Sequence, residues 1–258
     1  MAEAAIRVER RGGVVRCTLD RPPLNLFEPG LIAALRATFV SLAADPTVRL
    51  AVLTGAGRAF TGGMDVRVLR DLDAAGAATL ITSLHDAIEA VHRAPFPVVA
   101  AVNGHALGAG FELAIACDLR VAAAEATFGL PEVCVGVPSV IQAALLPPLI
   151  GPARAAELLL TGATIGAEQA LTWGLVNRVV ERAGLEAAVD SVVDAITACA
   201  PAAVRLQKQL IVRWRESDLP AAIRAGIATF AASYGTGEPR EGTAAFLEKR
   251  PPRFEELR

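Results

Sequence analysis

The sequence has few cysteines, few aromatic residues and little net charge. Its 258 residues include four cysteines, Cys17, Cys117, Cys134 and Cys199, and no two of them form a Cys-x-x-Cys pair. This spacing argues against a disulfide framework and a zinc site, so we expect no metal and interpret Cys117 and Cys134 as small buried hydrophobes. The net charge is −2 without a basic block, which argues against nucleic acid as the main partner.

Long apolar runs are also missing. None approaches the ~18 residues needed to span a bilayer, and the start, MAEAAIRVERRGG, has no apolar signal-peptide core. We therefore expect a cytoplasmic, soluble protein without a membrane partner. Because 53% of the residues are hydrophobic, the chain can bury one large core, or a core with an appended helical piece. The surplus of apolar residues indicates burial between subunits.

Short apolar runs alternate with amphipathic segments up to residue 132, which indicates parallel β-α-β units after an N-terminal hairpin. From Gly151 onward the pattern is almost wholly helical, with one apolar interruption at 175–180. The sequence therefore predicts an α/β core and a helical C-terminal third. The expected strands are 5–9, 14–19, 50–54, 97–102 and 118–122, the expected helices before Gly151 are 28–43, 67–73, 80–91 and 111–117, and 127–132 forms a compact loop that starts a short helix.

The central stretch runs from Pro97 to Glu112 and reads PVVAAVNGHALGAGFE. A buried strand here leads into a glycine-rich turn and a helix, and the N–H groups at such a helix start form an anion site. Gly104, Gly108 and Gly110 match the spacing of some dinucleotide-binding loops. Those loops lie early in a chain, whereas this one begins after residue 100. The alternative anion is a transient oxyanion on a thioester carbonyl.

A second glycine-rich turn, Gly62-Gly63-Met64, also precedes a helix, and two carboxylates follow in the chain. Two such turns can each give one N–H to a single carbonyl oxygen, which is how an oxyanion hole is built. Glu112 follows the central turn in a run with few charges, and Glu132 follows the apolar segment 128–131. Carboxylates in apolar settings have raised pKa values, and a pair at one site can divide acid and base work.

These residues lie in segments that resemble the crotonase superfamily of enoyl-CoA hydratases and isomerases. The resemblance covers essentially the whole chain, and the ordered set of motifs is specific although each motif alone is not. It implies a spiral of ββα superhelix repeats over residues 1–195, which carries the CoA and catalytic site, and a helical trimerisation region over 196–258. The matching segments are AFTGGMDV at 59–66, PVVAAVNGHALGAGFELAIACDLRVA at 97–122, FGLPEVCVGVP at 128–138, LLLTGATIGAEQALTWGLVNRVV at 158–180 and EGTAAFLEKRPPRF at 241–254.

The resemblance also implies roles for individual residues. The two oxyanion donors of the family fall on the N–H groups of Met64 and Ala109, and the two glutamates of the hydratases fall on Glu112 and Glu132, which are 20 positions apart. Isomerases of the family commonly keep only the second carboxylate, so the presence of both favours a lyase that hydrates a 2-enoyl-CoA. By analogy, water held between the glutamates adds to the β-carbon, and Glu132 protonates the α-carbon.

The CoA contacts of the family fall on the backbone of Gly62, Met64 and Val66, and on Phe246 and Lys249 reaching a neighbouring subunit. As a surface residue, Lys249 is equally compatible with a solvated charge pair. The resemblance implies no separate cofactor, because coenzyme A is part of the acyl-CoA substrate. It also implies a homotrimer or a dimer of trimers.

One segment departs from the family pattern. Members often carry Pro-Gly-x-Gly-Gly a few residues after the second glutamate, whereas this chain has GVPSVIQ at 136–142, which is one residue shorter and lacks those glycines. We therefore expect a reshaped acyl pocket. Three alternatives to hydration stay open: a Δ3-Δ2 enoyl-CoA isomerase, another acyl-CoA enolate reaction such as retro-aldol cleavage or dehalogenation, and a catalytically idle acyl-CoA-binding or scaffold member.

Other polar residues near these motifs have structural interpretations. Asp65 suits a helix cap. His105 is interpreted as packed or hydrogen-bonded rather than as a base. His85 and His92 are seven positions apart on one expected helix face, and we predict that both lie at the surface or at an interface.

Overall fold

The computed structural model describes residues 5–257, so the first four residues of the start that we interpreted as lacking a signal peptide lie outside it. Within that range, no single helix is long and apolar enough to cross a membrane. The helical segments 182–197 and 201–215 would be long and apolar enough only if they were taken together, and the chain bends by 106° between them.

The larger of two sheets has six strands, and its N-terminal pair forms the expected antiparallel hairpin. All the other neighbours in this sheet run parallel, which confirms the prediction of β-α-β units. The sheet is buried on both faces because alternate residues of its central strands enter two separate hydrophobic clusters. Its strands, in spatial order, are β1 (Ile6–Arg11), β2 (Val14–Leu19), β3 (Leu50–Gly55), β5 (Val98–Val102), β7 (Leu119–Ala123) and β10 (Arg178–Val180).

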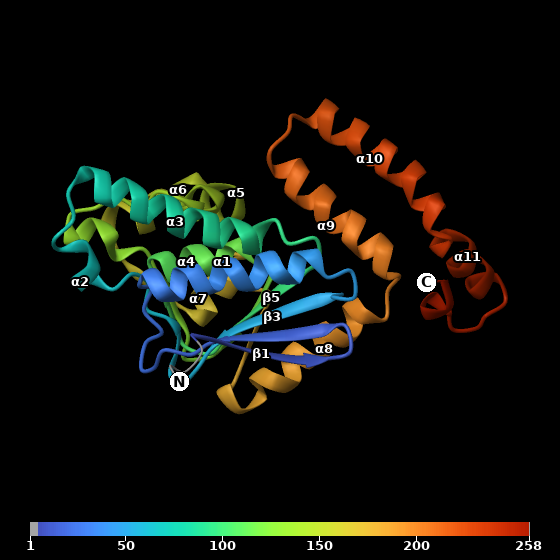
Figure 1. Cartoon of the computed structure of the whole chain (residues 1–258), viewed down its shortest axis with the longest axis horizontal. Helices are drawn as coiled ribbons and strands as arrows, with labels where there is room; N and C mark the ends of the chain where they lie inside the picture. The colour runs from blue at the N-terminus through green and yellow to red at the C-terminus, as the bar shows by residue number, and fades with distance from the viewer. Residues whose placement is uncertain (1–4, 258) are drawn as a thin grey trace.

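The smaller sheet consists of four three-residue strands that the sequence did not predict. Each of β3, β5 and β7 is followed by one of these short strands and then by helical structure, so the chain winds as ββα repeats (Figure 1). This arrangement confirms the fold that the resemblance implied. The expected loop at 127–132 in fact begins with a strand. The region after Gly151 is mostly helical as predicted, and a strand, Arg178–Val180, lies in the expected interruption at 175–180, but the strand Thr164–Gly166 was not expected. The strands are β4 (Ala59–Thr61), β6 (His105–Leu107), β8 (Thr127–Gly129) and β9 (Thr164–Gly166), the last antiparallel to β8.

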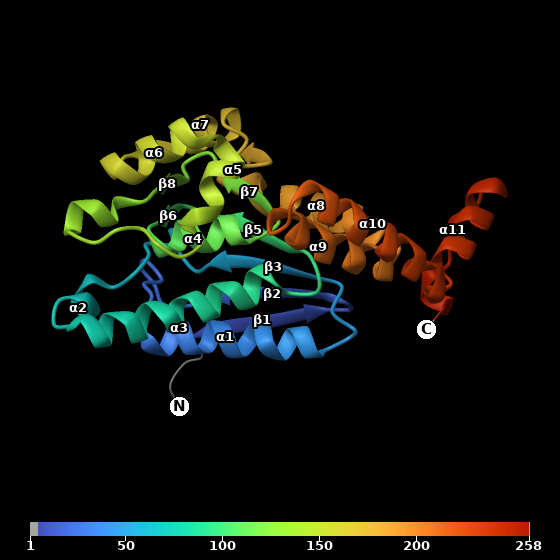
Figure 2. The same cartoon turned by 90° about the horizontal axis from the view of Figure 1, so that it is seen from above.

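Four helices surround the central turns. α1 (Pro29–Ala44) and α3 (Ala74–His92) lie side by side on one face of the larger sheet (Figure 2). α3 begins earlier than the predicted 80–91 because Asp73 caps it, with its side chain accepting from the Gly76 N–H at 2.7 Å. α2 (Val66–Leu69) is shorter than the expected 67–73. α4 (Ala109–Ala116) corresponds to the expected helix 111–117, and every one of its residues is buried.

Two predictions of burial were wrong. His92 is only 4% exposed, because α3 packs on α4 and the His92 Nδ1 lies 3.1 Å from the Ala116 carbonyl oxygen. Cys134 is exposed, since it lies on a single turn of 3-10 helix, η1 (Pro131–Val135), at the molecular surface. Cys117 is buried as expected.

The helices beyond the larger sheet fall into two groups. One group, up to α8, packs on the α/β body, whereas α10 and α11 extend away from it in both views (Figures 1 and 2). α9 is joined to the body by a buried ion pair in which Lys208 Nζ lies 2.7 Å from Asp118 Oδ1. The division of the chain at residues 195 and 196 stays a prediction. The elements are η2 (Gln142–Leu145), α5 (Leu146–Ile150), α6 (Pro152–Thr161), α7 (Ala167–Thr172), η3 (Arg182–Gly184), α8 (Leu185–Thr197), α9 (Pro201–Arg215), α10 (Leu219–Ser233), η4 (Tyr234–Thr236), α11 (Glu238–Leu247) and η5 (Phe254–Leu257).

Candidate active site

The first glycine-rich turn connects β4 to α2. Asp65 caps α2, with its side chain accepting from the Arg67 N–H at 3.0 Å, and this confirms its interpretation as a capping residue. The neighbouring backbone is tied to residue 27, because Phe27 donates to the Gly63 carbonyl and accepts from the Asp65 N–H. These two bonds leave the Met64 N–H between them without an acceptor among the described residues.

The second turn connects β6 to α4 through Gly108. This glycine has φ 54° and ψ −129°, a conformation that L side chains rarely adopt, and its carbonyl accepts from the N–H groups of Phe111 and Glu112. Ala109 is therefore the first residue of the helix, and its N–H has no intrahelical partner. Within residues 5–257 it has no other protein acceptor either.

The two turns pack directly against each other. A Cβ atom on Gly63 would come within 2.5 Å of the Leu107 carbonyl oxygen and 3.4 Å of the Ala109 backbone nitrogen. Glycine at 63 is thus required for the close approach, and φ is 86° there as well. The approach brings the free N–H groups of Met64 and Ala109 to the same pocket, which is the arrangement expected of an oxyanion hole.

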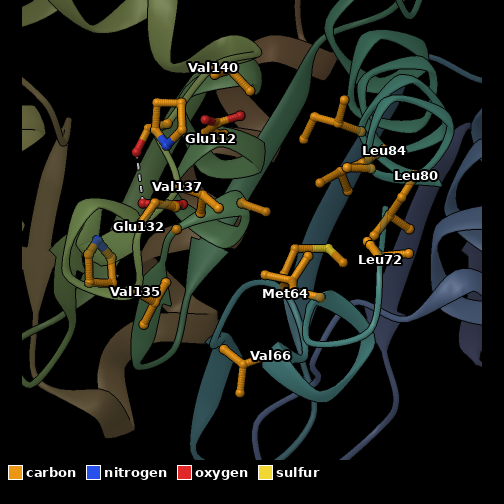
Figure 3. Close-up of a pocket in the computed structure, with 18 of the residues that line it drawn as sticks. Met64, Val66, Leu72, Leu80, Leu84, Glu112, Glu132, Val135, Val137 and Val140 are labelled. Carbon is orange, nitrogen blue, oxygen red and sulfur yellow. Dashed lines mark hydrogen bonds between the residues drawn. The ribbon is translucent and has the colours of Figure 1, made fainter. Parts of the chain in front are cut away.

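A pocket of about 420 Å³ lies in front of these turns. Six of the eight predicted site residues line it, and the two glutamates lie on the wall opposite the aliphatic side chains of α3 and Met64 (Figure 3). Apart from the glutamates, Ser139 provides the only side-chain oxygen among the described residues that line the pocket. The predicted residues in the lining are Gly62, Met64, Val66, Ala109, Glu112 and Glu132, and the main aliphatic ones are Leu69, Leu72, Leu80, Ile81, Leu84, Val135, Val137 and Val140.

Glu112 is almost completely buried, with 2% of its surface exposed. Burial, and secondarily the charge of Glu132, raise the pKa of its carboxyl from 4.5 to about 8, although backbone N–H groups of the segment 140–143 act in the opposite direction. Its Oε2 atom is buried without a hydrogen-bond partner among the described residues. A buried, unpaired carboxyl oxygen that lines a pocket is available to water or to a ligand.

Glu132 lies on η1 and is held from two sides. Its Oε1 faces the start of α4, where a Cβ on Gly108 would lie only 2.6 Å away. Its Oε2 accepts a hydrogen bond of 2.8 Å from the Ser139 hydroxyl, drawn as a dashed line in Figure 3. The negative charge of Glu132 contributes to the raised pKa of Glu112, so the two carboxylates interact at one pocket.

The other two predicted residues are outside this pocket. Phe246 is 83% exposed on α11, and Lys249 follows that helix with φ 55°. Neither lines the pocket of its own chain, and their contact with CoA in a neighbouring subunit stays a prediction. His105, whose Nδ1 lies 2.8 Å from the Thr127 hydroxyl, is the hydrogen-bonded histidine that we expected.

Two parts of the site were not predicted from the sequence. Leu80 and Leu84 of α3 form part of the pocket wall, but no role in the site was predicted for them. Ser139 likewise had no predicted role. The available signal was the departure of the segment 136–142 from the family pattern, in which a serine stands where the pattern has a glycine.

The arrangement can stabilise negative charge on a carbonyl oxygen while two carboxylates manage a proton nearby. Among the described residues, no group of three or more His, Cys, Asp or Glu side chains is placed to hold a metal ion. The aliphatic wall suits a hydrocarbon chain, since burial of apolar surface contributes ~25 cal/mol per Å².

Known proteins provide an independent comparison. A family model described as enoyl-CoA hydratase/isomerase matches residues 9–257. A crotonyl-CoA hydratase from Syntrophomonas wolfei is 35% identical and aligns over 98% of this chain and 99% of its own length. A carnitinyl-CoA dehydratase from Escherichia coli K12 is also 35% identical, over 96% of this chain and 97% of its own. The crystal structure of an enoyl-CoA hydratase from Mycobacterium smegmatis superposes with a TM-score of 0.95 at 35% identity, covering 98% of this chain and 100% of that one.

Proposed function

The chain belongs to the enoyl-CoA hydratase/isomerase family, and on that premise we propose that it is a lyase that adds water across the 2,3 double bond of a 2-enoyl-CoA thioester. The family implies a CoA thioester as substrate. The observation that carries the proposal is the pair of carboxylates, Glu112 and Glu132, beside the unpaired N–H groups of Met64 and Ala109. CoA is part of the substrate, and the reaction needs no further cofactor.

In this mechanism the thioester oxygen accepts hydrogen bonds from the N–H groups of Met64 and Ala109, which stabilise the enolate that forms on addition. Glu112 is neutral at neutral pH, since its pKa is about 8, and it holds the water without adding a second charge. Glu132 takes a proton from that water as the oxygen adds to the β-carbon. The same carboxyl then delivers a proton to the α-carbon, so that the two steps together add one water molecule.

The acyl group is proposed to be aliphatic. Its tail would lie between Leu80 and Leu84 of α3 and Val137 of the opposite loop. Within residues 5–257, the lining contains no aromatic side chain and, besides the two glutamates, no charged one that could bind a cationic tail. The CoA portion is proposed to bind along the backbone of Gly62 to Val66.

We also propose that the chain forms a homotrimer or a dimer of trimers through residues 196–258. Large apolar side chains are exposed on this region, including Ile227 at 67%, Phe230 at 68% and Leu247 at 79%. In such an assembly, Phe246 and Lys249 would reach the CoA of a neighbouring copy. Light scattering would test the proposal, and a monomer at micromolar concentration would contradict it.

The decisive experiment is a turnover assay with crotonyl-CoA and a longer 2-enoyl-CoA, which follows loss of the conjugated thioester absorbance. Glu112→Gln and Glu132→Gln are each expected to lower kcat by about 10²–10⁴-fold, while binding of a saturated acyl-CoA is retained. A matched control is Glu157→Gln, an exposed glutamate on α6 outside the pocket.

A wild-type protein that binds both esters and hydrates neither would contradict the proposal. The next substrate would be a 3-enoyl-CoA, since an isomerase is expected to depend on Glu132 alone. Binding without any turnover would indicate a non-catalytic acyl-CoA-binding member of the family.

A further inference from the structure

The Glu132 carboxylate has no support from its own helix. η1 is a single 3-10 turn of five residues, and none of its residues is fully buried. A side chain on so short an element keeps its rotamer only through contacts with other segments. For Glu132, the backbone at Gly108 and the hydroxyl of Ser139 provide such contacts.

The segment after η1 turns back so that Ser139 meets Glu132. Gly136 has φ 87° and ends η1, and the Val137 N–H donates to the Glu132 carbonyl at 3.2 Å. This bond ties the segment to the backbone of the same glutamate whose carboxylate Ser139 contacts. The segment is where the chain departs from the family pattern, because it lacks the glycines of that pattern and carries a serine directly after Pro138.

We infer that Ser139 is a positioning residue for the hydration reaction, whose hydroxyl holds the Glu132 carboxylate in the orientation and charge state in which it accepts a proton from water. The inference rests on the proposed function. It adds a residue of this chain's own, in the segment that departs from the family pattern, to the two glutamates and two N–H groups.

The chemistry of the hydroxyl explains the effect. A serine has one O–H to donate, and a donor at 2.8 Å favours the ionised form of a carboxylate over the neutral form. The start of α4 acts in the same direction, because the positive end of the helix dipole lies at Gly108 beside Oε1. Glu112, whose Oε2 is buried without a partner among the described residues and whose pKa is raised to about 8 by burial, is the member of the pair that holds the proton, which leaves Glu132 to accept one from water.

The test compares Ser139→Ala, which removes the donor, with Ser139→Thr, which keeps it. In hydration of a 2-enoyl-CoA, Ser139→Ala is expected to lower kcat about 10-fold, as loss of one hydrogen bond to a charged group implies, with KM changed less than about 2-fold. The acid limb of the pH profile is expected to move to higher pH by about half a unit to one unit. Ser139→Thr is expected to restore kcat.

Ser83→Ala is the matched control, because Ser83 is exposed on α3 and donates only to the Thr79 carbonyl. It is expected to leave kcat and the pH profile unchanged. Wild-type kcat and pH profile in Ser139→Ala would overturn the inference. So would a Ser139→Thr variant as slow as Ser139→Ala, because the hydroxyl would then not be the group that matters.

A second readout separates this inference from the proposed function. Carbon-13 NMR of labelled glutamate carboxyls, with the Glu132 signal assigned from Glu132→Gln, reports the hydrogen bond to its carboxylate without substrate. Ser139→Ala is expected to shift that signal, and Ser139→Thr to restore it. Absence of hydration in the wild type would contradict the proposed function alone, whereas an unmoved Glu132 signal in Ser139→Ala would overturn the role of Ser139.

Discussion

The Oε1 atom of Glu132 lies so close to the Cα of Gly108 that a Cβ at residue 108 would come within 2.6 Å of it. Gly108 also has φ 54° and precedes the first residue of α4, whose N–H is proposed to bind the thioester oxygen. One glycine therefore fixes the start of the buried helix and leaves room for the carboxylate. The backbone at Gly108 therefore positions the Ala109 N–H, the proposed oxyanion donor, relative to the Glu132 carboxylate, the proposed proton acceptor.

Gly108→Ala is expected to disturb both features. The positive φ costs about 1–3 kcal/mol for a residue with a side chain, and the new methyl group displaces the Glu132 carboxylate. We expect kcat for hydration to fall at least about 10-fold. Gly12→Ala is a matched control, because Gly12 has φ 58° with nothing near its Cβ position. The Gly12→Ala variant should lose a similar amount of stability and keep its activity. Equal losses of kcat in the two variants would contradict a role for the close approach between Gly108 and Glu132.

Glu112 is expected to make stability depend on pH. Its folded-state pKa of about 8 lies above the ordinary value of 4.5, so the folded protein keeps a proton that the unfolded chain releases. The unfolding free energy therefore falls as pH rises from about 4.5 to about 8, and is constant with respect to this group outside that window. Glu112→Gln is expected to be more stable than wild type by about 2–4 kcal/mol at pH 8.5 and by little at pH 4. Urea unfolding of both proteins at pH 4 and pH 8.5 measures this difference in unfolding free energy. A difference that is the same at both pH values would contradict the raised pKa of Glu112.

The larger sheet could be predicted from the sequence, whereas the short strands of the smaller sheet and the burial of His92 could not. Short, continuous apolar runs separated by amphipathic segments predicted the parallel strands of the larger sheet, because a strand that is buried on both faces is hydrophobic along its whole length. The strands of the smaller sheet contain three residues each, which is too short for any periodicity to be visible. His92 looked like a surface residue because its burial depends on where α3 crosses α4, a tertiary relationship that no local pattern encodes.

The candidate site could likewise be predicted only in part. The two glutamates and two turns were predicted because glycine-rich turns before helices and carboxylates in apolar runs are visible in the linear sequence. The pairing of Ser139 with Glu132 depends on the return of a loop through a left-handed Gly136, which the sequence does not specify. The sequence also indicated a raised pKa for Glu112, which lies in a run with few charges, whereas the extent of the increase depends on how deeply α4 is buried.

The activity is expected to fall at high pH for the same reason. Glu112 holds water as a neutral carboxyl, and its ionisation places two charges on one pocket, which opposes proton acceptance by Glu132. We expect log kcat/KM to decline above a break near pH 8. Measurements of kcat/KM at limiting crotonyl-CoA between pH 6 and 10 test this, with circular dichroism to exclude unfolding. A profile that is flat to pH 10 would show that Glu112 does not need its proton.

The oxyanion donors are backbone groups, so an ordinary side-chain substitution cannot remove one. Ala109 is an exception in principle, because proline is tolerated at the first position of a helix, where its missing N–H has no intrahelical partner. Ala109→Pro removes the proposed donor while α4 can still form, and kcat is expected to fall by about 10²–10³-fold. Ala167→Pro is the matched control, since Ala167 is the first residue of α7, follows a glycine and is outside the pocket. If Ala109→Pro binds a saturated acyl-CoA like wild type and retains its kcat, the thioester oxygen does not depend on this N–H, and the oxyanion assignment is wrong.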